Sequence, residues 1–138
     1  MFPFEDNGDV RVSDYVVIPK ALWEHSIEVA AAFTSPDTPL NRDCFYVAVV
    51  HDLIEDGLCT LEDLEKAGAS KEVLEAVDYI TRREDEVYSD YISRCKQNKI
   101  ARMVKLEDLK VNIKRCAADL PDRLSLLERY VKAYRKLQ

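Results

Sequence analysis

The sequence predicts an all-α fold, a single compact bundle of six or seven helices. Only 3 glycines and 5 prolines occur in the 138 residues, and the prolines stand at the edges of segments. Residues that favour helices, chiefly Ala, Leu, Glu, Lys and Arg, fill the segments between them. The length suits one domain with its own core. We expect this domain to cover 19–138, after an irregular lead-in over 1–18.

The first half of the chain predicts two helices that meet at a loop. Pro19 suits the first turn of a helix, and apolar residues then recur at helical spacing up to a Pro-rich loop over 34–39. Asn41 is the predicted N-cap of the next helix, which includes 44–54. That helix is apolar almost all round, so we expect it at the centre of the bundle. Gly57 is expected to end it.

Further start signals divide the second half. Thr60 and Asp63 resemble a capping box that opens a short helix to Ala67, and Ser70 is a predicted N-cap. The charged segment 82–86 predicts a linker or lid. We find no convincing pair of strands. The remaining predicted helices are 70–81, 88–96, 99–116 and a last helix that begins at Pro121.

Charge and cysteine usage exclude several classes of protein. The net charge of -6 argues against a general nucleic-acid binder, which needs a basic surface. The longest apolar run, 44–50, is too short to cross a bilayer. The acidic start is unlike a signal peptide. The four cysteines are scattered without a C-x-x-C pair, which favours neither a zinc site nor a disulfide scaffold. We expect a cytoplasmic protein with reduced thiols.

One edge of the central helix gathers groups that bind metals or protons. Residues four apart share a helix face, so His51 lies above Glu55, and Asp52 lies above Asp56. Burying so many unpaired polar groups would be costly. A divalent cation would offset the carboxylate charges and accept the imidazole as a ligand. The same pattern also fits a solvated helix end.

Two further residues are candidate ligands, but their spacing fits either a metal ligand or an ordinary core or surface residue. His25, the other of the 2 histidines, lies on an amphipathic helix, where a histidine often belongs to the core. Asp108 and Asn112 are one turn apart on a helix whose other side is apolar. An acid on such a helix is often solvated, so spacing alone does not decide between solvent and metal.

Four segments follow one another in an order that resembles a known family. HSIEVA over 25–30 is similar to H-P-L-x-V-A, and VVHDLIEDG over 49–57 is similar to L-L-H-D-V-x-E-D-T. TLEDL over 60–64 resembles T-x-E-D/E-L/I, and VKLEDLKVN over 104–112 resembles V-K-L-A-D-x-x-x-N. Together they resemble the HD-domain phosphohydrolase superfamily, in particular the hydrolase domain of the RelA/SpoT type. TRREDEVYSDYISR over 81–94 is similar to a segment of short stand-alone bacterial HD proteins.

The resemblance implies roles for individual residues. The implied ligands of one divalent ion, Mn²⁺ first and Fe²⁺ or Zn²⁺ as alternatives, are His25, His51, Asp52 and Asp108. Glu55 and Asp56 match the acidic pair that orients and deprotonates the attacking water, and Asn112 matches a residue that holds the sugar end of the substrate. These assignments imply metal-assisted hydrolysis with a carboxylate as the general base.

Several cations are candidates for holding a phosphorylated substrate: Lys20, Arg82, Arg83, Arg94 and Lys105. Arg82 and Arg83 also fit a solvated helix end, where cations are favoured by the helix dipole. The RelA/SpoT-type enzymes have a basic segment before the first histidine. This chain has YVVIPK over 15–20 instead, so only Lys20 could replace it.

The sequence therefore predicts an enzyme that hydrolyses a phosphate or pyrophosphate ester of a nucleotide, with (p)ppGpp-like 3′-pyrophosphates as the leading substrates. One alternative is a nucleoside monophosphate phosphatase on the same metal site. Another is a metal- or nucleotide-binding module without turnover. We expect a small phosphorylated nucleotide-like partner, no nucleic acid and no membrane, and we leave a homodimer open.

Overall fold

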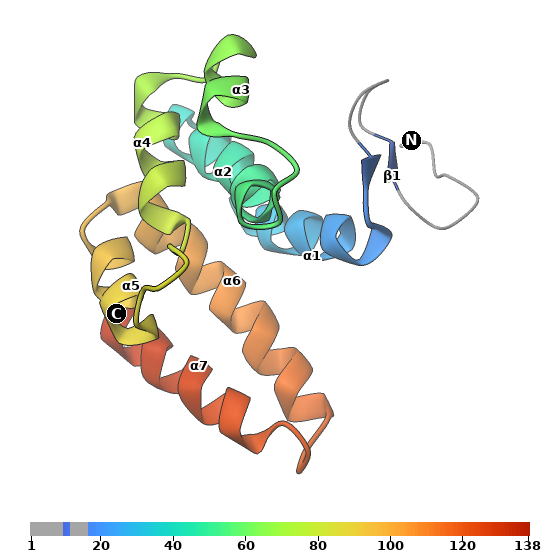
Figure 1. The fold of residues 1–138 in the computed structure, drawn as a ribbon. Coiled ribbons are helices and arrows are strands. Elements are labelled where there is room, and N and C mark those ends of the chain that lie inside the picture. The colour runs from blue at the N-terminus through green and yellow to red at the C-terminus, as the bar shows by residue number, and fades with distance from the viewer. Residues whose placement is uncertain (1–9, 12–16) are drawn as a thin grey trace.

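A computed structural model describes residues 10–11 and 17–138, and in this part the chain forms a helical bundle (Figure 1). The prediction of an all-α bundle of six or seven helices is confirmed. Its elements are α1 (Lys20–Ala30), the 3-10 turn η1 (Ala31–Phe33), α2 (Pro39–Glu55), α3 (Leu61–Lys66), α4 (Lys71–Ile80), α5 (Tyr88–Lys96), α6 (Lys99–Ala118) and α7 (Leu124–Leu137).

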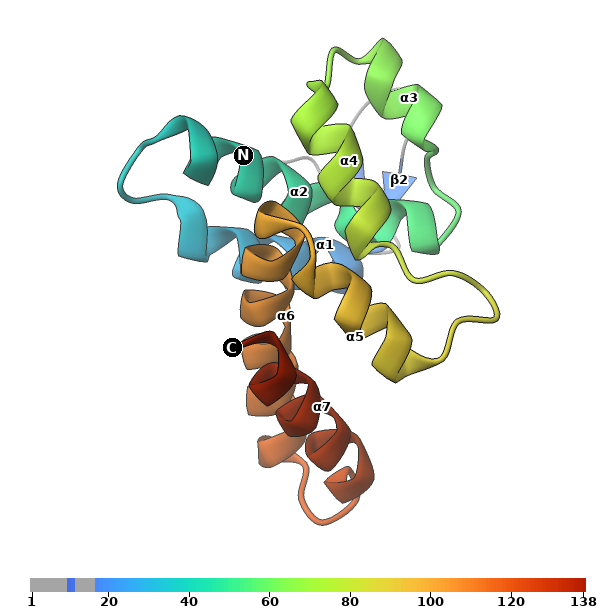
Figure 2. The ribbon, with the colours of Figure 1, turned by 90° about the vertical axis from the view of Figure 1, so that its left-hand side faces the viewer.

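Two helices, α2 and α6, form the centre of the bundle. α2 packs against α1, α4 and α6, while α6 packs against α1, α4, α5 and α7 (Figures 1 and 2). The apolar residues that fill α2 are the reason, because Cys44, Val47 and Ala48 are completely buried. The predicted central position of this helix is therefore confirmed. α7 returns beside α6 and also packs on α5.

The start of α2 differs from the prediction. Thr38, not Asn41, is the N-cap, and its Oγ1 accepts a hydrogen bond from the backbone N of Asn41 at 3.1 Å. The helix begins at Pro39 because a proline at the first position has no N–H to leave unsatisfied. Asn41 instead donates its side-chain N–H to the carbonyl of Pro36 at 2.8 Å, which holds the preceding loop.

The short connection after α2 follows the predicted cap signals. Gly57 adopts a φ of +73°, the left-handed conformation that suits glycine after a helix. Thr60 and Asp63 form the predicted capping box, with bonds of 3.1 and 3.0 Å between side chains and backbone N–H groups. Ser70 caps α4 through the backbone N of Val73. These local bonds turn the chain away from the end of α2.

Two other differences lie at the ends of the domain. Val10–Arg11 (β1) and Val17–Ile18 (β2) pair as short antiparallel strands, although the sequence showed no convincing strand pair. Residues 1–9 and 12–16 of the predicted lead-in lie outside the described residues. The last helix begins at Leu124 rather than at Pro121, because the chain turns over Pro121–Arg123 before α7 starts.

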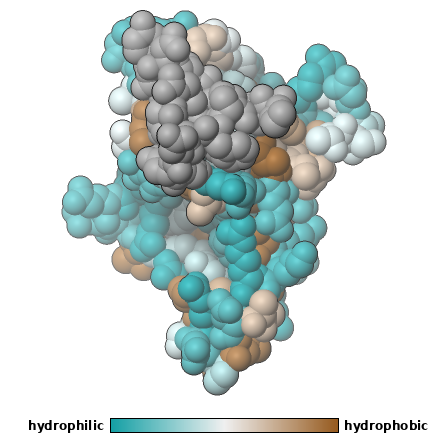
Figure 3. All heavy atoms as spheres, turned by 90° about the vertical axis from the view of Figure 1, so that its right-hand side faces the viewer, coloured by the Kyte–Doolittle hydropathy of each residue, from teal (hydrophilic) through white to brown (hydrophobic). Residues whose placement is uncertain are grey.

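No helix of the described residues combines the length and the apolar character needed to cross a membrane. One face of the molecule, drawn in Figure 3, carries mostly hydrophilic residues where it is described, with hydrophobic residues in small separate areas.

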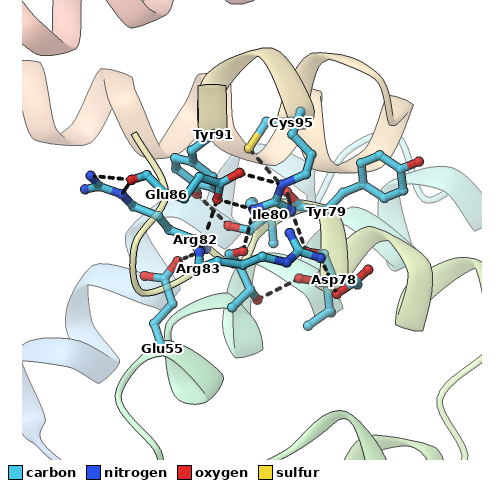
Figure 4. A network of polar contacts seen from close by, with 12 residues as sticks. Glu55, Asp78, Tyr79, Ile80, Arg82, Arg83, Glu86, Tyr91 and Cys95 are labelled. Carbon is cyan, nitrogen blue, oxygen red and sulfur yellow. Dashed lines mark hydrogen bonds and ion pairs between the residues drawn. The ribbon is translucent and has the colours of Figure 1, made fainter. Parts of the chain in front are cut away.

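The loop between α4 and α5 is held by Arg94, and its partners Glu86, Asp78 and Tyr79 are labelled in Figure 4. Its guanidinium donates to both carboxylate oxygens of Glu86, at 2.7 and 3.0 Å, and to the carbonyls of Asp78, Tyr79 and Thr81, each at 2.8 Å. Arg94 is the first cause that lowers the pKa of Glu86, to about 2, and the N–H of Arg83 adds to it. The segment predicted as a linker or lid is therefore tied to α5 by a charged, half-buried pair.

Replacing Glu86 with Gln should lower the free energy of unfolding by about 1–3 kcal/mol at pH 7, because Arg94 loses its charged acceptor. The unfolded carboxylate titrates near 4.5 and the folded one near 2. The stabilisation is thus present above about pH 4.5 and is lost as the pH falls towards 2. Urea unfolding at pH 7 and pH 3 measures both effects. Glu84→Gln, in the same exposed loop, is the control, and equal losses in the two variants would contradict the pairing.

Candidate metal centre

Four side chains from three helices converge on one point: His25 from α1, His51 and Asp52 from α2, and Asp108 from α6. One ligand atom from each lies within 4.8 Å of all the others. His51 Nε2 is 3.2 Å from Asp52 Oδ2 and 3.5 Å from Asp108 Oδ1. Neighbouring ligands of one ion at bond lengths of ~2.1 Å are roughly 3 Å apart, so these spacings suit a single cation.

The tautomer of the His51 imidazole leaves one ring nitrogen available to bind a metal. Its Nδ1 lies 2.6 Å from the backbone carbonyl of Ala48, so Nδ1 carries the proton and donates it. Nε2 is then left with a lone pair, and this atom is buried without a hydrogen-bond partner among the described residues. A backbone carbonyl that fixes the tautomer in this way is typical of metal-binding histidines. The orphaned Nε2, facing two carboxylates, fits a bound cation.

Asp108 carries a buried negative charge. Burial opposes its ionisation, but the ammonium of Lys105 at 2.8 Å and the contacts with His25 and His51 hold its pKa well below the usual range. Lys105 is affected in the opposite direction: burial lowers its pKa, and the charge of Asp108 raises it well above the usual value. The pair is therefore ionised, and Asp108 presents a charged oxygen to the centre.

Without a cation, a proton is drawn to His51. Burial alone would lower the pKa of this imidazole, but the contact with Asp108 and the charge of Asp52 raise it to about 9. The cause is the accumulation of negative charge around Nε2. A divalent cation would neutralise the same charge at the same place, which is why the donor set suits a metal.

His25 has an unusual second partner. Its Nε2 lies 2.6 Å from Asp108 Oδ1, and the guanidinium of Arg115 lies 3.0 Å from its Nδ1. Arginine only donates, so Nδ1 accepts and Nε2 carries the proton. A cation at Nε2 would move this proton to Nδ1, where Arg115 can no longer donate. Metal binding and the contact between Arg115 and His25 therefore exclude each other. Arg115 also pairs with Glu28 at 3.2 Å.

Three members of the cluster, His25, Asp52 and Asp108, line a cavity of about 640 Å³, a size that suits a small-molecule ligand. Glu55 and Asp56, the predicted acidic pair, both line it. An oxygen of Glu55 accepts a 2.7 Å hydrogen bond from the backbone N of Arg82 (Figure 4). Although Glu55 retains contact with solvent, enclosure by the protein raises its pKa, which the Arg82 N–H and the Lys105 charge oppose. Glu55 is thus held beside the cluster with an altered basicity.

The structure brings half of the predicted substrate-binding residues to this cavity. Arg82, Lys105 and Asn112 line it. The remaining three do not: Lys20 lies 3.8 Å from Glu24 at the start of α1, Arg83 pairs with Asp78, and Arg94 holds the loop described above. The N–H donors of Arg94 bind Glu86 and backbone carbonyls instead of facing the cavity.

The cavity also contains residues that sequence reasoning missed. Arg115 lines it from α6, and Arg129 and Tyr130 line it from α7. No motif marks these positions, because they face the site only through the packing of α7 on α6. The sequence does show aromatic and basic residues at helical spacing on α7. This pattern is equally typical of an ordinary amphipathic helix, so it did not indicate a site.

The four cysteines do not take part in the cluster. Cys44 and Cys95 are buried, and burial raises the pKa of each thiol to about 11. Such thiols are poor metal ligands, since the thiolate is the binding form. The predicted oxygen and imidazole ligand set is therefore supported over a thiolate site.

The sequence matches no model of a known protein family, and it matches no curated protein. A function can therefore be inferred only from the residues of the cluster and its cavity and from the order of the motifs.

Asp108→Asn should remove most of the bound metal, because the variant keeps the size of the side chain but loses the charged ligand oxygen. We expect about one transition-metal ion per chain in the wild type and much less in the variant. Elemental analysis after dialysis against Mn²⁺ measures this, and circular dichroism checks the fold. Asp78→Asn, which changes an exposed acid outside the cluster, is the matched control. Full occupancy in Asp108→Asn would exclude Asp108 as a ligand.

Proposed function

We propose that this protein is a metal-dependent hydrolase of a phosphate or pyrophosphate ester of a small nucleotide. The observation that carries the proposal is the buried Nε2 of His51, which has no hydrogen-bond partner among the described residues and faces Asp52 and Asp108. Both carboxylates line a ligand-sized cavity. Asp52, Asp108 and the two imidazoles would hold the cation. The order of the motifs, which resembles that of HD-domain phosphohydrolases, supports the same reading.

The residues around the cluster have the chemistry that such a reaction needs. The bound cation would supply Lewis acidity, lowering the pKa of a water molecule and withdrawing charge from a phosphoryl oxygen. Glu55, which accepts a hydrogen bond from the N–H of Arg82, would accept the proton of the attacking water. Asp56 lines the same cavity and would orient that water, while Arg82 and Asn112 would contact the substrate.

The leading substrates are (p)ppGpp-like nucleotide 3′-pyrophosphates, and Mn²⁺ is the leading metal. Both follow from the resemblance to the RelA/SpoT type. One observation favours turnover over a binding module: Glu55, a carboxylate that could act as a general base, lines the cavity and is held there by the backbone N–H of Arg82.

The test is a panel of nucleotides incubated with the protein and Mn²⁺. Release of pyrophosphate would support the leading reading, and release of orthophosphate from nucleoside monophosphates would support the phosphatase alternative. No phosphorus product from any member of the panel, with metal bound, would favour the binding module.

Glu55→Gln should reduce turnover at least about a hundredfold, because the amide keeps the hydrogen bond to Arg82 but cannot accept a proton. Metal content and folding should be retained. Steady-state kinetics on a substrate that the wild type cleaves, together with elemental analysis, measure both. Glu75→Gln on α4, an exposed change of the same kind far from the cavity, should leave turnover unchanged.

Asp56→Asn should act in the same direction but less strongly if the carboxylate only orients the water. Near-wild-type turnover in both Glu55→Gln and Asp56→Asn, with metal bound, would show that this acidic pair does not provide the base.

A further inference from the structure

A second cavity, of about 390 Å³, lies between α5 and α7. Tyr88 and Arg129 line both this cavity and the one that holds the metal cluster. The two spaces are therefore neighbours that share a wall. Ile92 and Ala133 give the second cavity an apolar floor.

The charge of the second cavity is opposite to that of the chain as a whole. Arg129, Lys132 and Lys136 follow at helical spacing on one face of α7, and all three line it. None of its lining residues is acidic. In a chain with a net charge of -6, this collection of cations is a local site for an anion.

The cations at the shared wall have donors to spare. The guanidinium carbon of Arg129 lies 3.6 Å from the ring centre of Tyr88, a direct contact that fixes the group and leaves its N–H donors free. Neither Arg129 nor Lys132 makes a hydrogen bond or an ion pair within the described part of the chain. Lys136, which also lines the cavity, donates to the carbonyl and to the hydroxyl oxygen of Ser89, at 2.9 Å each.

We propose that the cavity between α5 and α7 is a second anion subsite that selects substrates with two separated phosphate groups. It rests on the proposed function: one phosphate is held at the metal cluster, and the other is held by Arg129 and Lys132. The apolar floor and the Tyr88 ring accommodate the uncharged part next to the distal phosphate. Arg129 is the specificity-determining residue at the junction, since it faces both spaces.

The shared wall is the reason to assign the distal phosphate to the substrate rather than to a separate anion. A ligand that enters the metal cavity and extends past Tyr88 meets Arg129 directly. A monophosphate can use only one of the two sites. A bisphosphate can use both without paying a second loss of translational freedom, so its affinity exceeds that of either monophosphate.

The test compares the binding of adenosine 3′,5′-bisphosphate with that of the 3′- and 5′-monophosphates. Calorimetric titrations use the full chain with Mn²⁺ and the Glu55→Gln change, in which no turnover is expected to interfere. We expect the bisphosphate to bind at least about tenfold more tightly than either monophosphate. Lys132→Gln and Arg129→Gln should each remove this advantage of the bisphosphate over the monophosphates. Arg135→Gln, an equal change of charge on α7 outside both cavities, should alter nothing.

Three results would overturn the subsite. The first is a bisphosphate that binds no better than the monophosphates, and the second is equal loss in Lys132→Gln and Arg135→Gln. In the third, inorganic phosphate binds in a Lys132-dependent way while the bisphosphate has no advantage, which would assign the site to a separate anion. Binding alone decides these outcomes, so they are independent of whether the nucleotide panel shows turnover.

Discussion

The arrangement of the central helices depends on one buried carboxylate, that of Asp108. This residue is only 3% exposed, and its oxygens contact Lys105 on the same helix and His25 on α1. An ionised carboxylate in the interior costs several kcal/mol unless it is paired. A shift of α1 by one residue would rotate His25 by about 100° away from it. The same contacts of Asp108 therefore hold the candidate metal cluster together and fix how α1, α2 and α6 pack.

His51 and Asp52 could be selected from the sequence because they are polar residues in an apolar helix, whereas His25 and Asp108 were assigned as ligands only through the resemblance of the motif order. The four predicted ligands do converge, and the capping box at Thr60 forms as expected. The first residue of α2 was harder to predict, since Thr38 and Asn41 are both good N-caps and only the position of Pro39 decides between them. Arg94 shows a second limit of prediction from sequence. Its spacing fits a substrate contact, but the fold of the loop engages all its donors elsewhere.

The loop between α4 and α5 links the Glu86–Arg94 ion pair, which stabilises the fold, to the position of Glu55 in the cavity. Its backbone reaches Glu55 through the N–H of Arg82, while Glu86 binds Arg94 on α5. Glu55 is thus held by a backbone group whose own position depends on an ion pair outside the cavity. Support of this kind would let the cavity stay open to a ligand while the carboxylate proposed as the base keeps its position.

Acidic and basic side chains both line the cavity, and they are unevenly distributed. Asp52, Glu55 and Asp56 stand on the α2 side, whereas α6 contributes Lys105 and Arg115 beside the single acid Asp108, and α7 contributes Arg129. A cation at the ligand cluster would neutralise the acidic side and, by moving the proton of His25 to Nδ1, would release Arg115 from that nitrogen. In the proposed function, the cation and the guanidinium released from His25 would both favour an anionic substrate in this cavity. We therefore expect such a substrate to bind more tightly once the metal is bound.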